Sequence, residues 1–230
     1  TGVATDGSSL NTAFGDSMTM SKDGTTLAIG VPGLDNSDKS DAGAVYIYKW
    51  NRDDSTNTYT LDQTINEPGD LVDAKFGSTL SMNHAGTRLA IGAEKSANPM
   101  EMKFDSGKTT FDLQDTNIVD LNTGSGATYT ATKYNTKFVL DDRIVSENVS
   151  ENDDYGRGVC MIDNNLYIGA SKDEGHTGLS NDGSLYCYDL TIEGEYAWKN
   201  ITTETALVDI EKLGHVFDFD NRSKQIRNYY

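Results

Sequence analysis

Apolar and polar residues alternate along this chain in short runs, and one arrangement of these runs recurs three times. Each recurrence begins with an aromatic residue followed by glycine and leads, after a short turn, into Leu-x-Ile-Gly. The three instances are Phe14-Gly15 with Leu27-Ala28-Ile29-Gly30, Phe76-Gly77 with Leu89-Ala90-Ile91-Gly92, and Tyr155-Gly156 with Leu166-Tyr167-Ile168-Gly169. Repeated units of this kind usually build a scaffold rather than a single active site.

Each unit is predicted to form four strands. Leu27, Ile29 and Val31 alternate with small residues and so share one strand face. The turns at 22–24 and 85–86 contain the Asp-Gly and Ala-Gly pairs that suit tight hairpins. The predicted strands of the first unit are 14–21, 26–31, 44–50 and 59–66, and the third strand recurs at 127–133 and 184–190.

A constant spacing of 17 residues fixes how the last strand of each unit leads into the next opening. It separates Tyr59 from Phe76, Phe138 from Tyr155, and Tyr196 from Leu213. Leu213-Gly214 therefore predicts the start of a fourth unit. Four-stranded units at a period of about 60 residues are typical of β-propeller blades. We predict an all-β module over residues 1–230, a propeller of about three complete four-stranded antiparallel blades and a partial one. The blades would start near 14, 76, 155 and 213.

These strings resemble the FG-GAP repeat, the β-propeller repeat of integrin α-subunits and many microbial surface proteins. The matching strings span about residues 14–220, although Glu94 stands where the family has proline. The resemblance implies propeller blades, usually seven, so that three and a half units imply missing sequence or an unusual closure. From Asp218 onward the chain also resembles segments of large virion structural proteins of marine tailed phages.

The FG-GAP resemblance further implies calcium in a D-x-D-x-D-G loop between the first two strands of a blade. Here the corresponding turns are 21–25, 83–87 and 163–165, and none supplies the roughly five to seven oxygen ligands that calcium requires. We therefore expect the usual calcium site of the family to be absent.

The composition argues against two classes of partner, nucleic acid and the membrane interior. The chain has 36 acidic and 19 basic side chains and a formal charge of −17, which argues against nucleic acid because phosphate binding needs a basic surface. No apolar run approaches the roughly 20 residues that span a bilayer, so membrane insertion is not expected. The chain begins without Met and its fourth unit is truncated, which predicts a piece of a longer extracellular or virion protein.

Two cysteines are predicted to remain thiols. Cys160 and Cys187 fall on the first and third strands of one predicted sheet. Two strand spacings separate them by roughly 9.6 Å, which exceeds the limit of about 7 Å between the Cα atoms of a disulfide.

The acidic residues concentrate in the segments that join second to third strands and one unit to the next. In a propeller these segments emerge on one face, so an acidic face that attracts cations or a basic partner is one interpretation. Ordinary solvated loops are the other. Within this set Asp35, Asp38 and Asp41 stand three residues apart. They are candidates for one loosely bound calcium ion, with a solvated loop as the alternative.

The longest of these segments, 95–125, is predicted to be an inserted hairpin with one apolar face. Its alternating apolar residues flank the turn 105–108, and two strands alone are marginal in water. The apolar face must therefore pack on the chain itself or on another molecule. The candidate partner-binding residues are Met100, Met102, Phe104, Phe111 and Leu113.

Candidate catalytic groups are scattered. His84, His176 and His215 lack the spacing of zinc ligands, and the acidic pairs Asp153-Asp154 and Asp70/Asp73 occur in an acid-rich chain. We expect a non-catalytic module, without a cofactor, of a larger surface or virion structural protein that binds other protein chains or a surface glycan. The alternatives are a carbohydrate-active propeller enzyme and a calcium-dependent lectin-like binder.

Overall fold

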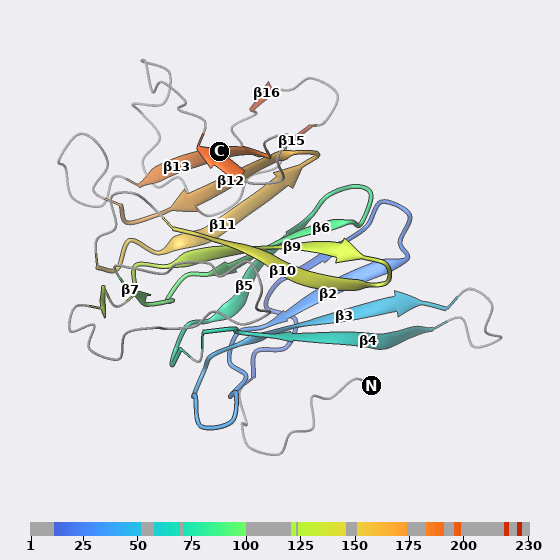
Figure 1. The fold of residues 1–230 in the computed structure, drawn as a ribbon, viewed down its shortest axis with the longest axis horizontal. Coiled ribbons are helices and arrows are strands. Elements are labelled where there is room, and N and C mark those ends of the chain that lie inside the picture. The colour runs from blue at the N-terminus through green and yellow to red at the C-terminus, as the bar shows by residue number, and fades with distance from the viewer. Residues whose placement is uncertain are drawn as a thin grey trace.

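Three four-stranded antiparallel sheets make up most of the fold (Figure 1). The computed structural model describes residues 12–51, 58–69, 71–99, 121–122, 124–145, 151–173, 183–190, 196–198, 219–220 and 225–226. The first sheet contains β1 (Met18–Met20), β2 (Thr26–Val31), β3 (Ala44–Trp50) and β4 (Tyr59–Asn66). The second contains β5 (Phe76–Met82), β6 (Arg88–Ala93), β9 (Ala127–Tyr134) and β10 (Lys137–Ile144). The third contains β11 (Tyr155–Ile162), β12 (Asn165–Ala170), β13 (Ser184–Leu190) and β14 (Tyr196–Trp198).

Strands that are consecutive within a sheet are also neighbours in space, so each sheet is a simple meander. The all-β class and the antiparallel four-strand units are therefore confirmed, and β2, β3, β4 and β13 have the predicted bounds. The described residues contain no helix, and within them no sheet closes on itself.

The first strand of the first unit is shorter than predicted and begins at Met18 rather than Phe14. In the other two units the strand begins at the aromatic residue, which pairs across a bulge with the last residue of its own second strand: Phe76 with Ala93 and Tyr155 with Ala170. Phe76 and Tyr155 also form parallel bridges with Gly43 and Gly126 of the preceding unit. In the described part of the chain no sheet precedes Phe14, so that this bridge is missing.

The glycine of each Phe/Tyr-Gly pair has a backbone conformation that side chains disfavour. Gly15, Gly77 and Gly156 have φ angles of 89°, 89° and 87°. In the second and third sheets a register shift follows directly, between Phe76 and Thr79 and between Tyr155 and Gly158. A β-bulge with a left-handed residue favours glycine, which explains why the pair recurs.

Successive sheets approach closely along their first strands. The Ser17 hydroxyl donates to the Gly77 carbonyl at 2.7 Å, and the Thr79 hydroxyl donates to the Gly156 carbonyl at 2.7 Å. A Cβ atom at Gly30 would lie 2.0 Å from the Gly77 oxygen, and one at Gly92 would lie 2.1 Å from the Gly156 oxygen. The glycine that ends Leu-x-Ile-Gly is thus required by the contact between sheets.

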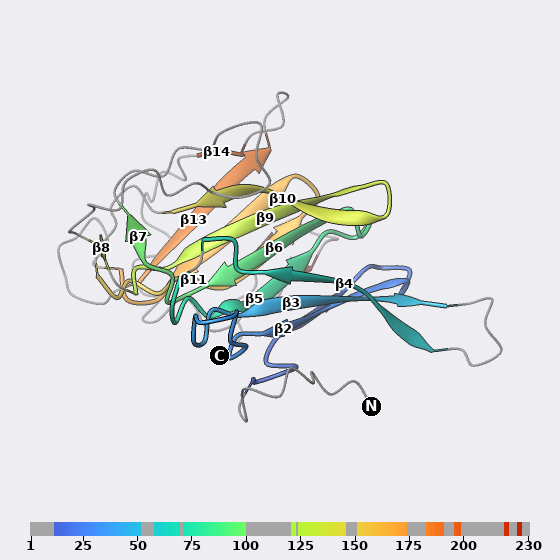
Figure 2. The same ribbon diagram turned by 60° about the horizontal axis from the view of Figure 1, so that its bottom comes forward.

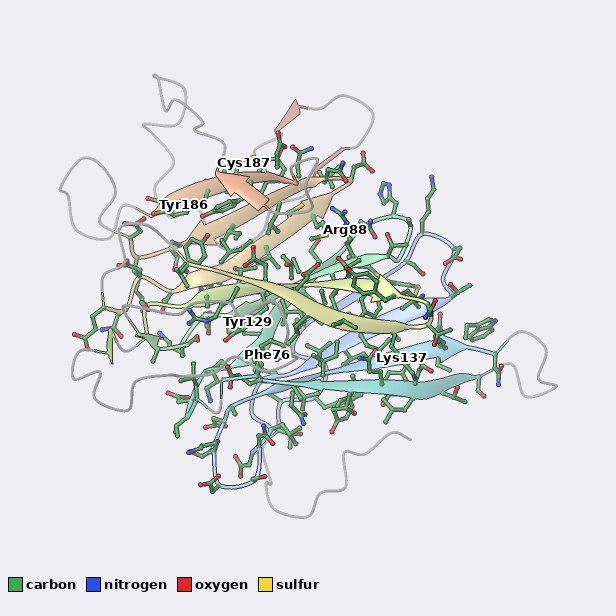
Figure 3. The ribbon with its side chains drawn as sticks, in the orientation of Figure 1. Phe76, Arg88, Tyr129, Lys137, Tyr186 and Cys187 are labelled. Atoms are coloured by element: carbon green, nitrogen blue, oxygen red, sulfur yellow. The ribbon has the colours of Figure 1, made fainter. Side chains whose placement is uncertain are left out.

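Apolar side chains fill the space between the sheets. Ile47 and Ile65 of the first sheet pack with Phe76, Leu89 and Tyr129 of the second. The rings of Phe76 and Tyr129 meet edge to face with centroids 5.1 Å apart (Figure 3). A second cluster joins the second sheet to the third in the same way and includes Ala90, Ile144, Tyr155, Leu166 and Ile168.

The outer strands of the first two sheets are joined by side chains, among them Gln63 of β4 and Lys137 of β10, which pairs with Asp62. The Gln63 amide nitrogen donates to the Phe138 carbonyl at 2.6 Å, and its oxygen accepts from the Phe138 amide at 2.8 Å. This amide links β4 to β10 as a backbone peptide would, so the two sheets are tied at their outer strands as well as their first strands.

Two further predictions concern the third and fourth units. No disulfide joins Cys160 and Cys187, as predicted; they lie in register with Tyr167 of β12 between them. The proposed start of the fourth unit at 213–214 lies outside the described residues. Beyond it a short ladder pairs β15 (Phe219–Asp220) with β16 (Gln225–Ile226).

We expect Gly92→Ala to lower the free energy of unfolding by at least about 3 kcal/mol, because its methyl group has no room against the Gly156 carbonyl. Urea titration followed by circular dichroism measures this. Gly15→Ala is the matched control: its Cβ would meet no atom within 4 Å, so backbone strain alone should cost about 1–2 kcal/mol. Equal losses in the two variants would contradict the close-approach argument.

Candidate interaction site at the loop end of the sheets

The meander places the connections between second and third strands and between sheets at one end of the stack, opposite the tight hairpins (Figures 1 and 2). We call this the loop end. Its described residues are 32–43, 67–69, 71–75, 94–99, 121–122, 124–126, 145, 151–154, 171–173 and 183. The inserted segment also departs from this end.

A buried ion cluster joins the second and third sheets at the loop end. The Asp154 carboxylate is completely buried and is paired with Lys95, with Lys172 at 2.9 Å and with Arg157 at 3.5 Å. Lys95 follows β6, whereas Lys172 follows β12. Burial would raise the pKa of Asp154, but the hydrogen bonds and charges of Lys172 and Lys95 outweigh it and lower that pKa below its ordinary 3.8. Asp154 is therefore ionised and holds two sheets together.

The junction between the first and second sheets has the opposite charge at the same position. Lys75 directly precedes Phe76, as Asp154 precedes Tyr155, and both residues have a φ angle of 55°. The Lys75 ammonium group lies 3.0 Å from the Asp41 carboxylate and 3.1 Å from that of Asp73. Desolvation would lower the pKa of Lys75, but hydrogen bonds to these two carboxylates raise it. The central charge is thus positive at the junction of the first and second sheets and negative at that of the second and third.

A buried carboxylate also connects the loop after β4 to the second sheet. Glu67 accepts hydrogen bonds from the amides of Gly69 at 2.9 Å and Leu71 at 3.0 Å, and from the Tyr129 hydroxyl at 3.0 Å. Burial raises the pKa of Glu67 although these three bonds oppose the rise. Burial also raises the pKa of Tyr129, to about 12, which keeps this hydroxyl a donor at neutral pH.

Arg143 extends this network to the base of the inserted segment. Its Nε donates to the Tyr129 hydroxyl at 3.1 Å, and its terminal nitrogen donates to the Ser96 hydroxyl at 3.1 Å and the Ala97 carbonyl at 2.9 Å. Directly beyond, β7 (Asn98–Pro99) pairs antiparallel with β8 (Leu121–Asn122). We call this ladder the stem. The inserted segment therefore leaves and returns through a stem that begins at a fixed point on the second sheet.

The predicted contact residues of the insertion lie outside the described residues, so their role stays a prediction. These are Met100, Met102, Phe104, Phe111 and Leu113. The stem pairs Asn98 with Asn122 and Pro99 with Leu121, and the hairpin within the insertion stays a prediction as well.

The three candidate calcium ligands have separate interactions within one loop. The Asp35 carboxylate accepts the amide of Asp41 at 2.9 Å, and the Asp41 carboxylate pairs with Lys75. Asp38 is exposed and lies 3.8 Å from the ammonium group of Lys39. Among the described residues no group of three or more His, Cys, Asp or Glu is arranged to hold a metal ion. A calcium ion in this loop stays a prediction.

The acidic pair considered for catalysis is buried. Asp153 and Asp154 are both inaccessible to solvent, and a general acid needs a raised pKa whereas that of Asp154 is lowered. Asp154 therefore lacks the raised pKa of a general acid. His84 is exposed in a hairpin turn, while Asp70, His176 and His215 lie outside the described residues.

Sequence reasoning missed the residues that build the loop end. Glu67, Asp154 and Asp173 were assigned to an acidic surface, but all three are buried, and Asp173 accepts a hydrogen bond from the Tyr186 hydroxyl. An alignment of the units would have paired Lys75 with Asp154 just before the aromatic opening. It would not have shown their partners, which lie on other loops.

Comparison with known proteins adds no further assignment: no model of a known protein family matches the chain, and no curated protein sequence matches it. In the part of the chain that the structure describes, no helix is long and apolar enough to cross a membrane.

We expect Asp154→Asn to lower stability by about 2 kcal/mol at pH 7, since Lys95 and Lys172 lose their shared counter-ion but can partly reach water. The folded pKa of Asp154 is depressed, so this contribution is present above about pH 3.8 and is lost as the pH falls through the folded pKa. Denaturant titrations of both proteins across this range measure it. Asp38→Asn, an exposed control, should change stability by less than about 0.5 kcal/mol. If the free energies of unfolding of the wild type and the Asp154→Asn variant differed by the same amount at every pH, this would count against the ion cluster.

We expect Arg143→Ala to loosen the stem, because Ser96 and Ala97 lose their hydrogen-bond donor. Limited proteolysis with mass spectrometry should show cleavage between residues 97 and 122 that is several-fold faster than in the wild type. Lys137→Ala removes a contact to Asp62 at the hairpin end and should leave this cleavage rate unchanged. Equal cleavage of the insertion in all three proteins would show that Arg143 does not hold the stem.

Proposed function

We propose that this chain is a non-catalytic β-propeller module, built from FG-GAP-like blades, of a larger surface or virion structural protein. It acts by presenting its loop end, with the inserted segment 95–125, to a protein chain or a surface glycan.

The propeller assignment is supported by the way consecutive sheets meet. Each sheet is a four-stranded meander in chain order, and the first strand of the next sheet packs on it: β5 on β1, β2 and β3, and β11 on β5, β6 and β9. Both junctions use the same hydroxyl-to-carbonyl bond and the same glycine contact. Such repetition is what stacked blades require.

The fixed stem of the insertion is the observation that carries the binding proposal. The inserted segment has more than 20 residues and leaves the second sheet. Arg143 donates a hydrogen bond to Ser96 at the base of this segment. Arg143 also donates to the Tyr129 hydroxyl, which in turn donates to Glu67. Binding residues are commonly carried on loops that a rigid scaffold positions. The nearest buried charges, at Asp154 and Glu67, are already used in structural contacts, which favours binding over acid–base catalysis at this end.

The double variant Met102→Asp/Phe104→Asp tests the proposal. Two carboxylates on the apolar face should reduce partner binding at least tenfold, because that face could no longer be desolvated. The variant should keep the wild-type melting temperature within about 2 °C. Binding of the chain to an array of surface glycans and incorporation of the whole parent protein into its assembly, seen by electron microscopy, are the two measurements.

Tyr134→Asp provides the matched control, because Tyr134 is an exposed aromatic residue at the hairpin end of the second sheet. It should affect neither binding nor assembly. Unchanged glycan binding and unchanged assembly in the double variant would exclude the insertion as the contact surface, and a large fall in melting temperature would show that its apolar face packs on its own chain.

A further inference from the structure

The first sheet exposes a face that the other two sheets bury. On this face Phe14, Met18 and Met20 are 39%, 64% and 47% exposed. The residues at the first and last of these positions in the other units are covered by the preceding sheet: Phe76 and Tyr155 are buried, and Met82 and Met161 are only 6% and 5% exposed. The same surface is thus an interface in two sheets and open in one.

The difference in side-chain exposure between the first sheet and the other two extends from β1 to β2. Leu27 and Ile29 of β2 are only half-buried. The residues at the same two positions of the second and third sheets have no exposed surface, and these are Leu89, Ile91, Leu166 and Ile168. A continuous apolar stripe on β1 and β2 therefore lacks the cover that its counterparts have.

The backbone of the first unit is shaped for the same close approach. Gly15 has the φ angle of Gly77 and Gly156. A Cβ at Gly77 would lie 2.7 Å from the Ala44 carbonyl oxygen and one at Gly156 would lie 2.4 Å from that of Ala127, whereas none would meet an atom within 4 Å at Gly15. Gly15 therefore has the left-handed conformation of Gly77 and Gly156, but no neighbouring backbone of the described residues lies against it.

The polar contacts between the first and second sheets and between the second and third sheets indicate which hydrogen-bonding groups a docking partner would need. The third residue after the aromatic, Ser17 or Thr79, donates to the glycine carbonyl of the next sheet. The fifth residue accepts a backbone amide of the next sheet: Thr19 accepts that of Met82 at 3.1 Å, and Ser81 accepts that of Met161 at 2.9 Å. The corresponding groups of the first sheet are the Gly15 carbonyl and the Met20 amide.

We infer that the exposed face of the first sheet is a docking surface for another four-stranded sheet of this repeat, one with hydroxyl residues at the third and fifth positions after its aromatic opening. A second copy of this chain matches less well, because the third sheet carries Gly158 and Cys160 at these two positions. This docking surface is separate from the loop end and does not depend on what the insertion binds.

Methionine oxidation tests the inference and provides its own internal control. In the chain itself, dilute hydrogen peroxide should oxidise Met18 and Met20 at least tenfold faster than Met82 and Met161, as followed by mass spectrometry. A copy of residues 76–150 is then placed ahead of residue 10, which keeps the 17-residue spacing between Phe138 of the copy and Phe14, so that a sheet with Thr and Ser at the two positions can dock. Met20 should now react as slowly as the native Met82 and Met161, and Met18 should react more slowly than in the original chain, because its counterparts Leu80 and Val159 are partly buried.

Two variants of the extended chain separate docking from misfolding. Thr79→Val with Ser81→Ala, made in the added copy only, should restore part of the oxidation of Met18 and Met20. Met18→Lys should lower the melting temperature of the extended chain by several degrees and leave that of the original chain unchanged.

Three results would overturn the inference. The first is rapid oxidation of Met18 and Met20 in the extended chain together with no effect of Met18→Lys on its melting temperature. The second is protection of the original chain that grows with concentration as light scattering shows a dimer, which would identify a second copy as the occupant. The third is protection in the original monomer, which would mean that its own chain covers this face.

Discussion

The close backbone approach between successive sheets is the constraint on which the rest of the structure depends. The glycine that ends Leu-x-Ile-Gly lies against the carbonyl group of the next Phe/Tyr-Gly glycine, with no space for a side chain. This contact allows the Ser17 and Thr79 hydroxyls to reach the next backbone. It also brings the aromatic openings into the apolar layer between sheets, where most of the buried surface lies.

On this common contact each junction carries different charges. The position before the aromatic opening is a cation between two carboxylates at the first junction and an anion between two ammonium groups at the second. A sheet docked at the wrong junction would bring like charges together or leave a buried charge unpaired, and both are costly. The backbone contact is therefore common to both junctions, whereas the paired charges are particular to each.

The features that could be predicted are those determined by residues close together along the chain. The bounds of β2, β3, β4 and β13 follow from alternation and from turn residues within a few positions, and they were predicted correctly. The start of β1 was predicted four residues too early: Phe76 and Tyr155 pair across a bulge with the end of their own second strand, whereas the pairing of β1 with β2 begins only at Met18. The charged residues of the loop end were taken for a solvent-exposed surface, although Glu67 and Asp154 are buried.

The sequence by itself determined the all-β class and the four-strand units, since both depend on residues close along the chain. Only the tertiary structure decided which charges are paired and which apolar face is covered. Lys95 and Asp154 are 59 residues apart, and Glu67 and Tyr129 are 62 apart. No local pattern encodes such partners, because the stacking of whole sheets brings them together. The same stacking leaves Met20 exposed while it buries Met82 and Met161 at the equivalent position of the other two units.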